Sequence, residues 1–215
     1  MGTHYLMLSK ERENTLRRNI EGFEIIISNL KLLPLQIIDL NEELEYTYGL
    51  AVMAMQNYVA MTCVDCHIIY SDLRKLNIKQ LKYSDLDKPY IKLKEFSDNL
   101  HKAVEKIPNS NYTKPELIHA LANSFRHRDD LEAYYYKMNN PPTDDNKKKD
   151  VPYHGNTSSV LNEYNLLLPY FPEDETCLPY PVTKGLELLD ENINLQKIAD
   201  DLCEWGMYSK ENVKD

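Results

Sequence analysis

The 215-residue sequence contains little glycine, with 6 residues. Sandwich and barrel folds need many tight turns, where glycine is the usual residue, so this scarcity favours helices. Long apolar runs are also absent, which excludes a membrane-spanning helix. The residues after Met1 show no basic stretch followed by a long apolar one, so no secretory signal is predicted. We therefore expect a soluble, cytoplasmic protein with no membrane contact.

Several motifs of nucleotide-binding and hydrolytic enzymes are missing as well. The sequence has no G-x-x-x-x-G-K loop, no G-x-G-x-x-G, no G-x-S-x-G and no H-E-x-x-H. The formal net charge is −9, whereas general nucleic-acid coat proteins use Lys and Arg to neutralise phosphates. A local basic site remains compatible with this charge, because net charge does not describe individual surface patches.

What the sequence does contain is helical periodicity. Apolar side chains recur at three- and four-residue steps, and no segment shows sustained strand alternation. We expect helices over residues 9–33, 41–76, 86–107, 113–138, 158–168, 183–191 and 194–205. Ser9 is the expected N-cap of the first helix and Gly206 the expected stop after the last.

This pattern predicts an all-α protein, an antiparallel helical bundle with a smaller helical C-terminal layer. Residues 1–138 form the bundle, and residues 139–157 are a polar, proline-containing loop. Residues 158–215 supply C-terminal helices that pack on the same domain.

Residues Cys63 to His67 match the C-x-x-C-H pattern of covalent haem attachment. Cys63 and Cys66 fall within the apolar stripe of the 41–76 helix, where free cysteine packs as a small hydrophobic side chain. Zinc would require two further ligands, and the other Cys and His show no paired spacing. We therefore favour core packing and expect no haem, no metal and no other cofactor.

The most informative segment is the helix expected over residues 113–138. Thr113 followed by Glu116 is a capping box, and Pro115 suits a first helical turn. Ile118, Leu121 and Phe125 project to one side of this helix. Six polar side chains share a neighbouring arc of about 100°. They are His119, Asn123, Arg126, His127, Asp130 and Tyr134.

These polar residues combine a base that titrates near neutral pH, a permanent cation, an amide and a phenol. Such a set suits binding of a phosphodiester and removal of a proton from a ribose 2′-hydroxyl, without a metal. Two alternatives need no catalysis. The face is either an ordinary solvated one, with Arg126 and Asp130 paired across one turn, or a set of buried polar contacts that fix helix packing.

The run from Leu121 to His127 resembles the core motif of HEPN domains (higher eukaryote and prokaryote nucleotide-binding), which are helical bundles. Asn123 and His127 stand at the Asn and His positions of that motif. Ala122 stands where the family has Arg, and Arg126, one turn along the same face, is the candidate substitute for the missing cation.

The resemblance implies a homodimer in which two such helices face each other across a cleft. It also implies RNA or a nucleotide as ligand, because many family members are metal-independent ribonucleases of toxin–antitoxin or phage-defence systems. Under this hypothesis His127, Arg126 and Asn123 are catalytic, and His119, Asp130 and Tyr134 contact the substrate. Other family members have lost the motif and only bind or scaffold. The alternative hypothesis is therefore a non-catalytic acidic adaptor, antitoxin or inhibitor that acts through a protein partner.

Overall fold

The computed structural model describes residues 2–75, 93–102, 104–108, 110–127, 160, 163 and 180–214. The helices in these ranges are α1 (Gly2–Leu30), α2 (Ile37–Lys75), α3 (Leu93–Lys102), α4 (Lys114–Arg126), α7 (Pro181–Glu187) and α8 (Leu195–Lys214). Within the same ranges, β structure is limited to an isolated bridge between Lys106 and Thr113. The predicted all-α fold class is thus confirmed.

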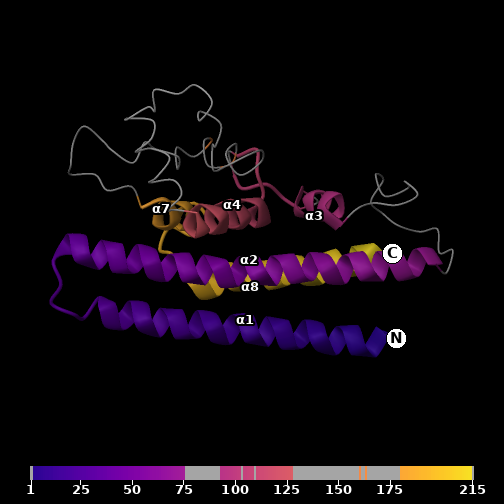
Figure 1. The fold of residues 1–215 in the computed structure, drawn as a ribbon, viewed down its shortest axis with the longest axis horizontal. Coiled ribbons are helices and arrows are strands. Elements are labelled where there is room, and N and C mark those ends of the chain that lie inside the picture. Colours follow the sequence, from indigo (N-terminus) through magenta and orange to yellow (C-terminus); the bar gives the residue numbers. More distant parts are fainter. Residues whose placement is uncertain are drawn as a thin grey trace, which may run out of the picture.

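The helices form two layers (Figure 1). The long helices α1, α2 and α8 lie along the main axis, with α8 antiparallel to α1, and α3, α4 and α7 cover α2 on its other side. Helix α2 contacts each of the other five described helices. The two C-terminal helices therefore belong to different layers. Helix α7 lies with α3 and α4, and α8 lies with α1 and α2. No described helix combines the length and apolar composition that a membrane crossing requires.

The buried face of α2 contributes more residues to the core than any other described helix. Its stripe continues for many turns at helical spacing. The buried members include Tyr48, Val52, Met55, Val59, Cys63, Cys66 and Tyr70. Cys63 and Cys66 pack in this stripe as small apolar side chains, and the imidazole of His67 packs edge-on against the ring of Phe96, with 5.3 Å between ring centroids. The structure thus places all three residues of the C-x-x-C-H segment in helix packing.

Several helix ends differ from the predicted ones. Helix α4 ends at Arg126, with His127 as its C-cap, instead of continuing to residue 138. Helix α2 begins at Ile37 instead of residue 41. Helix α1 begins before Ser9, whose hydroxyl donates to the Glu13 carboxylate one turn on, so Ser9 is not an N-cap. Helix α3 ends at Lys102 instead of residue 107, because the chain turns back through a bond from the Ile107 N–H to the Tyr112 carbonyl. Helix α8 continues past Gly206, so the predicted stop there is wrong.

Gly206 has a packing role instead. A Cβ at this position would lie 2.4 Å from the hydroxyl oxygen of Tyr58, so the glycine makes room for that buried ring from α2.

Polar contacts fix α7 and α8 onto the α1–α2 hairpin. The Glu45 carboxylate on α2 accepts hydrogen bonds from the backbone N–H groups of Val182 and Thr183, both at 2.8 Å. The Glu24 carboxylate on α1 accepts one from the Gln196 N–H at 3.1 Å. Both carboxylates satisfy donors in the first turns of helices, which otherwise have no partner within the helix.

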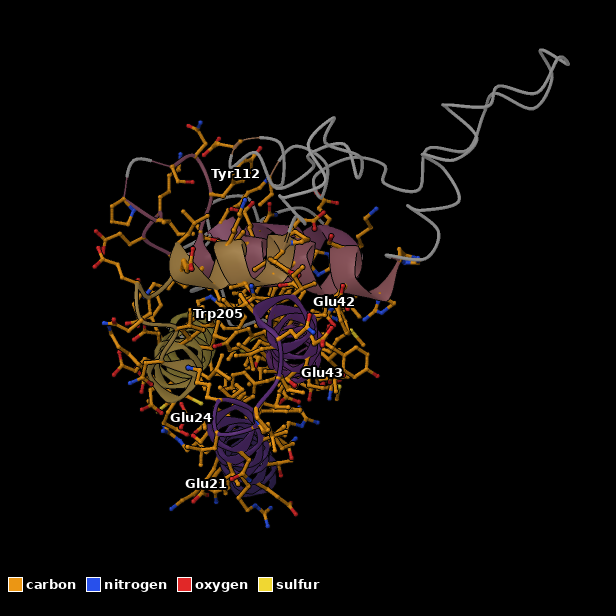
Figure 2. All side chains as sticks on the ribbon, turned by 90° about the vertical axis from the view of Figure 1, so that its left-hand side faces the viewer. Glu21, Glu24, Glu42, Glu43, Tyr112 and Trp205 are labelled. Carbon is orange, nitrogen blue, oxygen red and sulfur yellow. The ribbon has the colours of Figure 1, made fainter. Side chains whose placement is uncertain are left out.

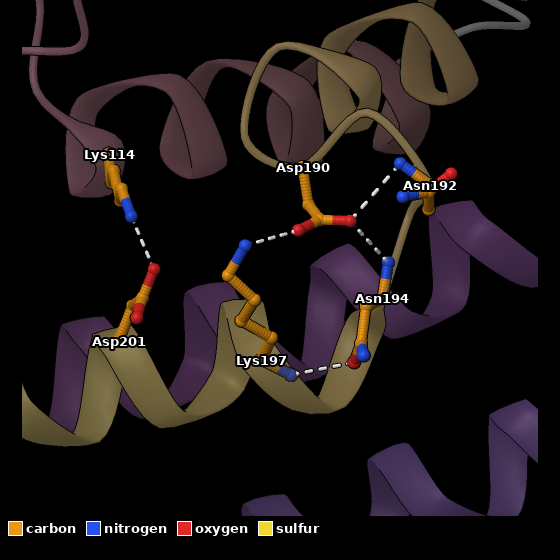
Figure 3. A network of polar contacts seen from close by, with 6 residues as sticks. All are labelled: Lys114, Asp190, Asn192, Asn194, Lys197 and Asp201. Atoms are coloured by element: carbon orange, nitrogen blue, oxygen red, sulfur yellow. Dashed lines mark hydrogen bonds and ion pairs between the residues drawn. The ribbon is translucent and has the colours of Figure 1, made fainter.

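Two further sets of polar contacts lie near α8, one in the turn that precedes it and one that joins it to α4 (Figure 3). The Asp190 carboxylate accepts from the backbone N–H groups of Asn192 and Asn194 and from Lys197, and these hydrogen bonds lower its pKa. Lys114 at the start of α4 pairs with Asp201 on α8.

Two glycines allow α4 to approach its neighbours closely. A Cβ at Gly49 on α2 would lie 2.1 Å from two carbons of the Phe125 ring, and a Cβ at Gly185 on α7 would lie 2.4 Å from a methyl carbon of Leu121. The absence of a side chain at these positions therefore sets the distance of α4 from α2 and α7.

We predict opposite effects for two alanine substitutions in helices. Gly49→Ala forces the Phe125 ring aside and should lower the free energy of unfolding by about 1–3 kcal/mol. The matched control is Gly22→Ala in α1, where an added Cβ meets nothing within 4 Å, so the variant should gain about 0.5–1 kcal/mol from helix propensity. Urea unfolding followed by circular dichroism measures both. Equal shifts in the two variants would contradict the packing argument.

Candidate functional site

The first turn of α4 is held by the predicted capping box. The Thr113 side chain accepts from the Glu116 N–H, and the Glu116 carboxylate accepts from the Thr113 N–H at 3.0 Å. The Thr113 hydroxyl also donates to the His101 carbonyl at 2.7 Å. The start of α4 is therefore tied to the end of α3, which fixes the orientation of the helix over α2.

The polar face of α4 points toward the edge of α2. His119 and Asn123 are half-buried and Arg126 is exposed. His127 is the C-cap, and its backbone N–H donates to the Asn123 carbonyl at 3.1 Å. The other two predicted site residues, Asp130 and Tyr134, lie outside the described residues. The structure thus places four of the six candidates on nine consecutive residues.

Gln56 of α2 contacts two of these four residues, and a third contacts one of those two. Its amide nitrogen lies 3.5 Å from Nδ1 of His119, and its amide oxygen accepts from the Arg126 guanidinium at 3.4 Å. The Asn123 amide lies 3.1 Å from Nε2 of His119. The Asn123 atom in this contact is its amide nitrogen, a donor like the Gln56 amide nitrogen. A neutral imidazole has one acceptor nitrogen, so the ring accepts a hydrogen bond from only one of these two amide groups. A row of polar contacts thus joins Arg126, Gln56, His119 and Asn123.

Burial keeps the side chains of His119 and His101, at the inner end of the polar face of α4, uncharged. Desolvation lowers the pKa of His119, opposed by Asp98 and reinforced by Arg126. The neighbouring His101 is more deeply buried, which lowers its pKa to about 4, with His119 as a further cause. The two rings are 5.9 Å apart between centroids. Both imidazoles are therefore neutral at pH 7 and cannot balance a phosphate charge.

Cys63 lies 3.5 Å from Nε2 of His101, which superficially resembles a nucleophilic cysteine–histidine pair. Burial raises the pKa of the Cys63 thiol to about 12 while it lowers the pKa of His101. A reactive pair needs the opposite shifts, a thiolate beside an imidazolium. This pair is accordingly a neutral core contact. Among the described residues, no three His, Cys, Asp or Glu side chains gather closely enough to hold a metal ion.

The structure also reveals a surface that the sequence reasoning missed, at the end of the α1–α2 hairpin. Apolar side chains are exposed there, with Leu32 at 82% and Ile37 at 78%. We define the hairpin tip as these exposed residues: Ile25, Ile26, Leu32, Leu33, Leu35, Ile37 and Ile38. The available sequence signal was the apolar run on both sides of Pro34, the residue that directly follows the predicted 9–33 helix.

Ile37 shows why the hairpin tip is unusual. It continues the buried stripe of α2 at helical spacing, through Asn41 and Leu44 to Tyr48. Tyr48 is buried and Leu44 is half-buried, whereas Ile37 is exposed. The face of α2 that forms the core thus extends, interrupted by Asn41, to an exposed apolar side chain at Ile37.

Comparison with models of known protein families, with curated proteins and with solved structures gives no match to this chain. The resemblance to HEPN domains therefore depends on the α4 residues alone, and function has to be argued from the site geometry.

We predict that His101 makes the protein less stable in mild acid. Its folded-state pKa of about 4 lies below its ordinary value of 6.5, so the unfolded chain binds the proton first as the pH falls. The contribution of uncharged His101 to the free energy of unfolding is fully present above pH 6.5. It declines between pH 6.5 and pH 4, by up to about 1.4 kcal/mol per pH unit. His101→Gln keeps an amide near Cys63 and does not titrate. The stability of the wild type relative to this variant, from urea unfolding, should therefore fall as the pH is lowered. A difference that does not change with pH would contradict the assignment.

Proposed function

We propose that this protein is a non-catalytic helical binding protein, an adaptor, antitoxin or inhibitor that acts through protein–protein contacts. The observation that carries the proposal is the hairpin tip. Soluble proteins seldom expose contiguous apolar patches, and larger ones usually mark interaction sites. Seven large aliphatic side chains project from one turn and the helix ends beside it.

The contacts made by the polar side chains of α4 support the same proposal. His119 and Asn123 contact each other, and His119 and Arg126 contact Gln56 of the same chain. This arrangement fits polar contacts that fix α4 on α2. A binding protein needs nothing more from these residues.

The proposal predicts a binding defect without a folding defect. Replacing Leu32 and Ile37 together by serine removes the two most exposed side chains of the hairpin tip, where stability changes of about 0.5 kcal/mol or less are expected. The matched control replaces Leu188 and Met207, exposed at 41% and 47% away from the tip. Affinity purification of the tagged full chain from its native cells, with mass spectrometry, measures the effect.

The expected result is one defined partner that is retained by the wild type and by the control but lost from the Leu32→Ser/Ile37→Ser variant. The purified partner should then re-form the complex with the wild type and with the control, but not with the Leu32→Ser/Ile37→Ser variant. Equal retention by the wild type and the variant would show that the hairpin tip is not the binding surface.

A second candidate function is a HEPN-like, metal-independent ribonuclease in a toxin–antitoxin or phage-defence system. One observation favours it. The exposed Arg126 guanidinium and the His127 ring follow each other at the described end of α4, with Asn123 one turn before. A cation, an imidazole and an amide close to one another could stabilise and deprotonate an RNA phosphodiester unit.

This candidate predicts that purified protein cleaves RNA in the presence of EDTA, and that His127→Ala lowers the rate by about 10²–10⁴-fold. The cap at His127 uses its backbone N–H, so that part of the helix end survives the substitution. Arg126→Ala should also lose activity, whereas Arg18→Ala, an exposed arginine on α1, should not. Absence of cleavage by the wild type, or full activity of His127→Ala, would eliminate this candidate.

A further inference from the structure

The charge around the hairpin tip is strongly one-sided. Between Asn19 and Leu50 the chain has six carboxylates and a single cation, Lys31. Glu24 and Glu45 accept hydrogen bonds from the starts of α8 and α7. The other four carboxylates are exposed. They are Glu21, Asp39, Glu42 and Glu43.

These carboxylates flank the tip on both sides. Figure 2 looks onto this end of the molecule and shows Glu21 and Glu24 on one side of α1, and Glu42 and Glu43 on the opposite side of α2. An apolar centre with a polar, charged rim is the usual organisation of a protein–protein interface. Apart from Lys31, the charged side chains of this rim are carboxylates, and Glu21 lies beside Arg17 and Arg18, which precede the segment on α1.

The negative charge of the rim favours some binding partners of the hairpin tip over others. A second copy of the chain, docked tip to tip, would bring two acidic rims together, and like charges across an interface oppose association. An anionic membrane surface would repel the same rim. A partner whose apolar face is bordered by Lys or Arg satisfies both parts of the surface at once, because its cations meet the carboxylates while the apolar groups are buried.

We propose that the hairpin tip binds an amphipathic helix of a partner protein, with an aliphatic face flanked by lysine or arginine. This inference rests on the proposed function, and it adds the chemistry of the partner. The aliphatic side chains provide the contact area. The rim carboxylates orient the helix and select against acidic partners.

The test uses two synthetic amphipathic helical peptides with the same leucine face, one with lysine and one with glutamate on the polar face. Binding to the full-length protein is measured by fluorescence anisotropy at low and high salt. The lysine peptide should bind at least about ten-fold more tightly than the glutamate peptide, and added salt should reduce that preference. Leu32→Ser/Ile37→Ser should lose about ten-fold or more, and Glu42→Gln/Glu43→Gln should lose less but weaken the salt dependence. Leu188→Ser/Met207→Ser should bind as the wild type does.

Three outcomes would overturn the inference. Equal binding of both peptides removes the charge selection. Lysine-peptide binding that survives Leu32→Ser/Ile37→Ser shows attraction to the acidic chain in general. Tip-dependent dimerisation in sedimentation, or tip-dependent binding to phosphatidylcholine or phosphatidylserine vesicles, identifies a different occupant. If a natural partner is captured through the tip and shows no preference for a basic rim, the inference fails while the proposed function stands. If no tip-dependent partner exists, the proposed function itself fails.

Discussion

The fold depends on the burial of one helix, α2, by all the others. Its 39 residues contact every other described helix, and its core face from Tyr48 to Tyr70 is apolar except for the buried side chains of Thr62 and Asp65. A helix that is apolar over much of its circumference must be covered on several sides. The two layers meet this requirement, with α1 and α8 on one side and α3, α4 and α7 on the other. Where the cover ends, at Ile37, the same apolar face is exposed to solvent.

The arrangement of α4 follows from that constraint. Close approach at Gly49 brings the helix onto α2, and the polar residues beside the contact must then find partners. Gln56 provides them for His119 and Arg126. The same burial that organises this row of side chains also keeps His101 and His119 neutral, so the chemistry of the face is limited by its packing.

Local features were predictable from the sequence, and features that join distant segments were not. The capping box of α4 spans four residues, and the stripe of α2 repeats within each turn, so both could be read directly. Glu45 and Val182 are 137 residues apart, and no local pattern pairs them. Gly206 was misread for the same reason, since a glycine that ends a helix and one that admits Tyr58 look alike in sequence. The link from Gln56 to His119 and Arg126 likewise requires the packed structure.

The carboxylates of Glu24 and Glu45 have a consequence for the order in which the chain folds. Both belong to the N-terminal hairpin formed by α1 and α2. These two helices are adjacent in sequence, so packing one against the other closes only a short loop. The first turns of α7 and α8 find their acceptors on that hairpin, 137 and 172 residues away. Because closing a short loop costs less entropy than joining segments this far apart, we expect the hairpin to assemble before these contacts form. During synthesis the N-terminal third would serve as a template, and the C-terminal helices would dock on it only after their own residues had been made.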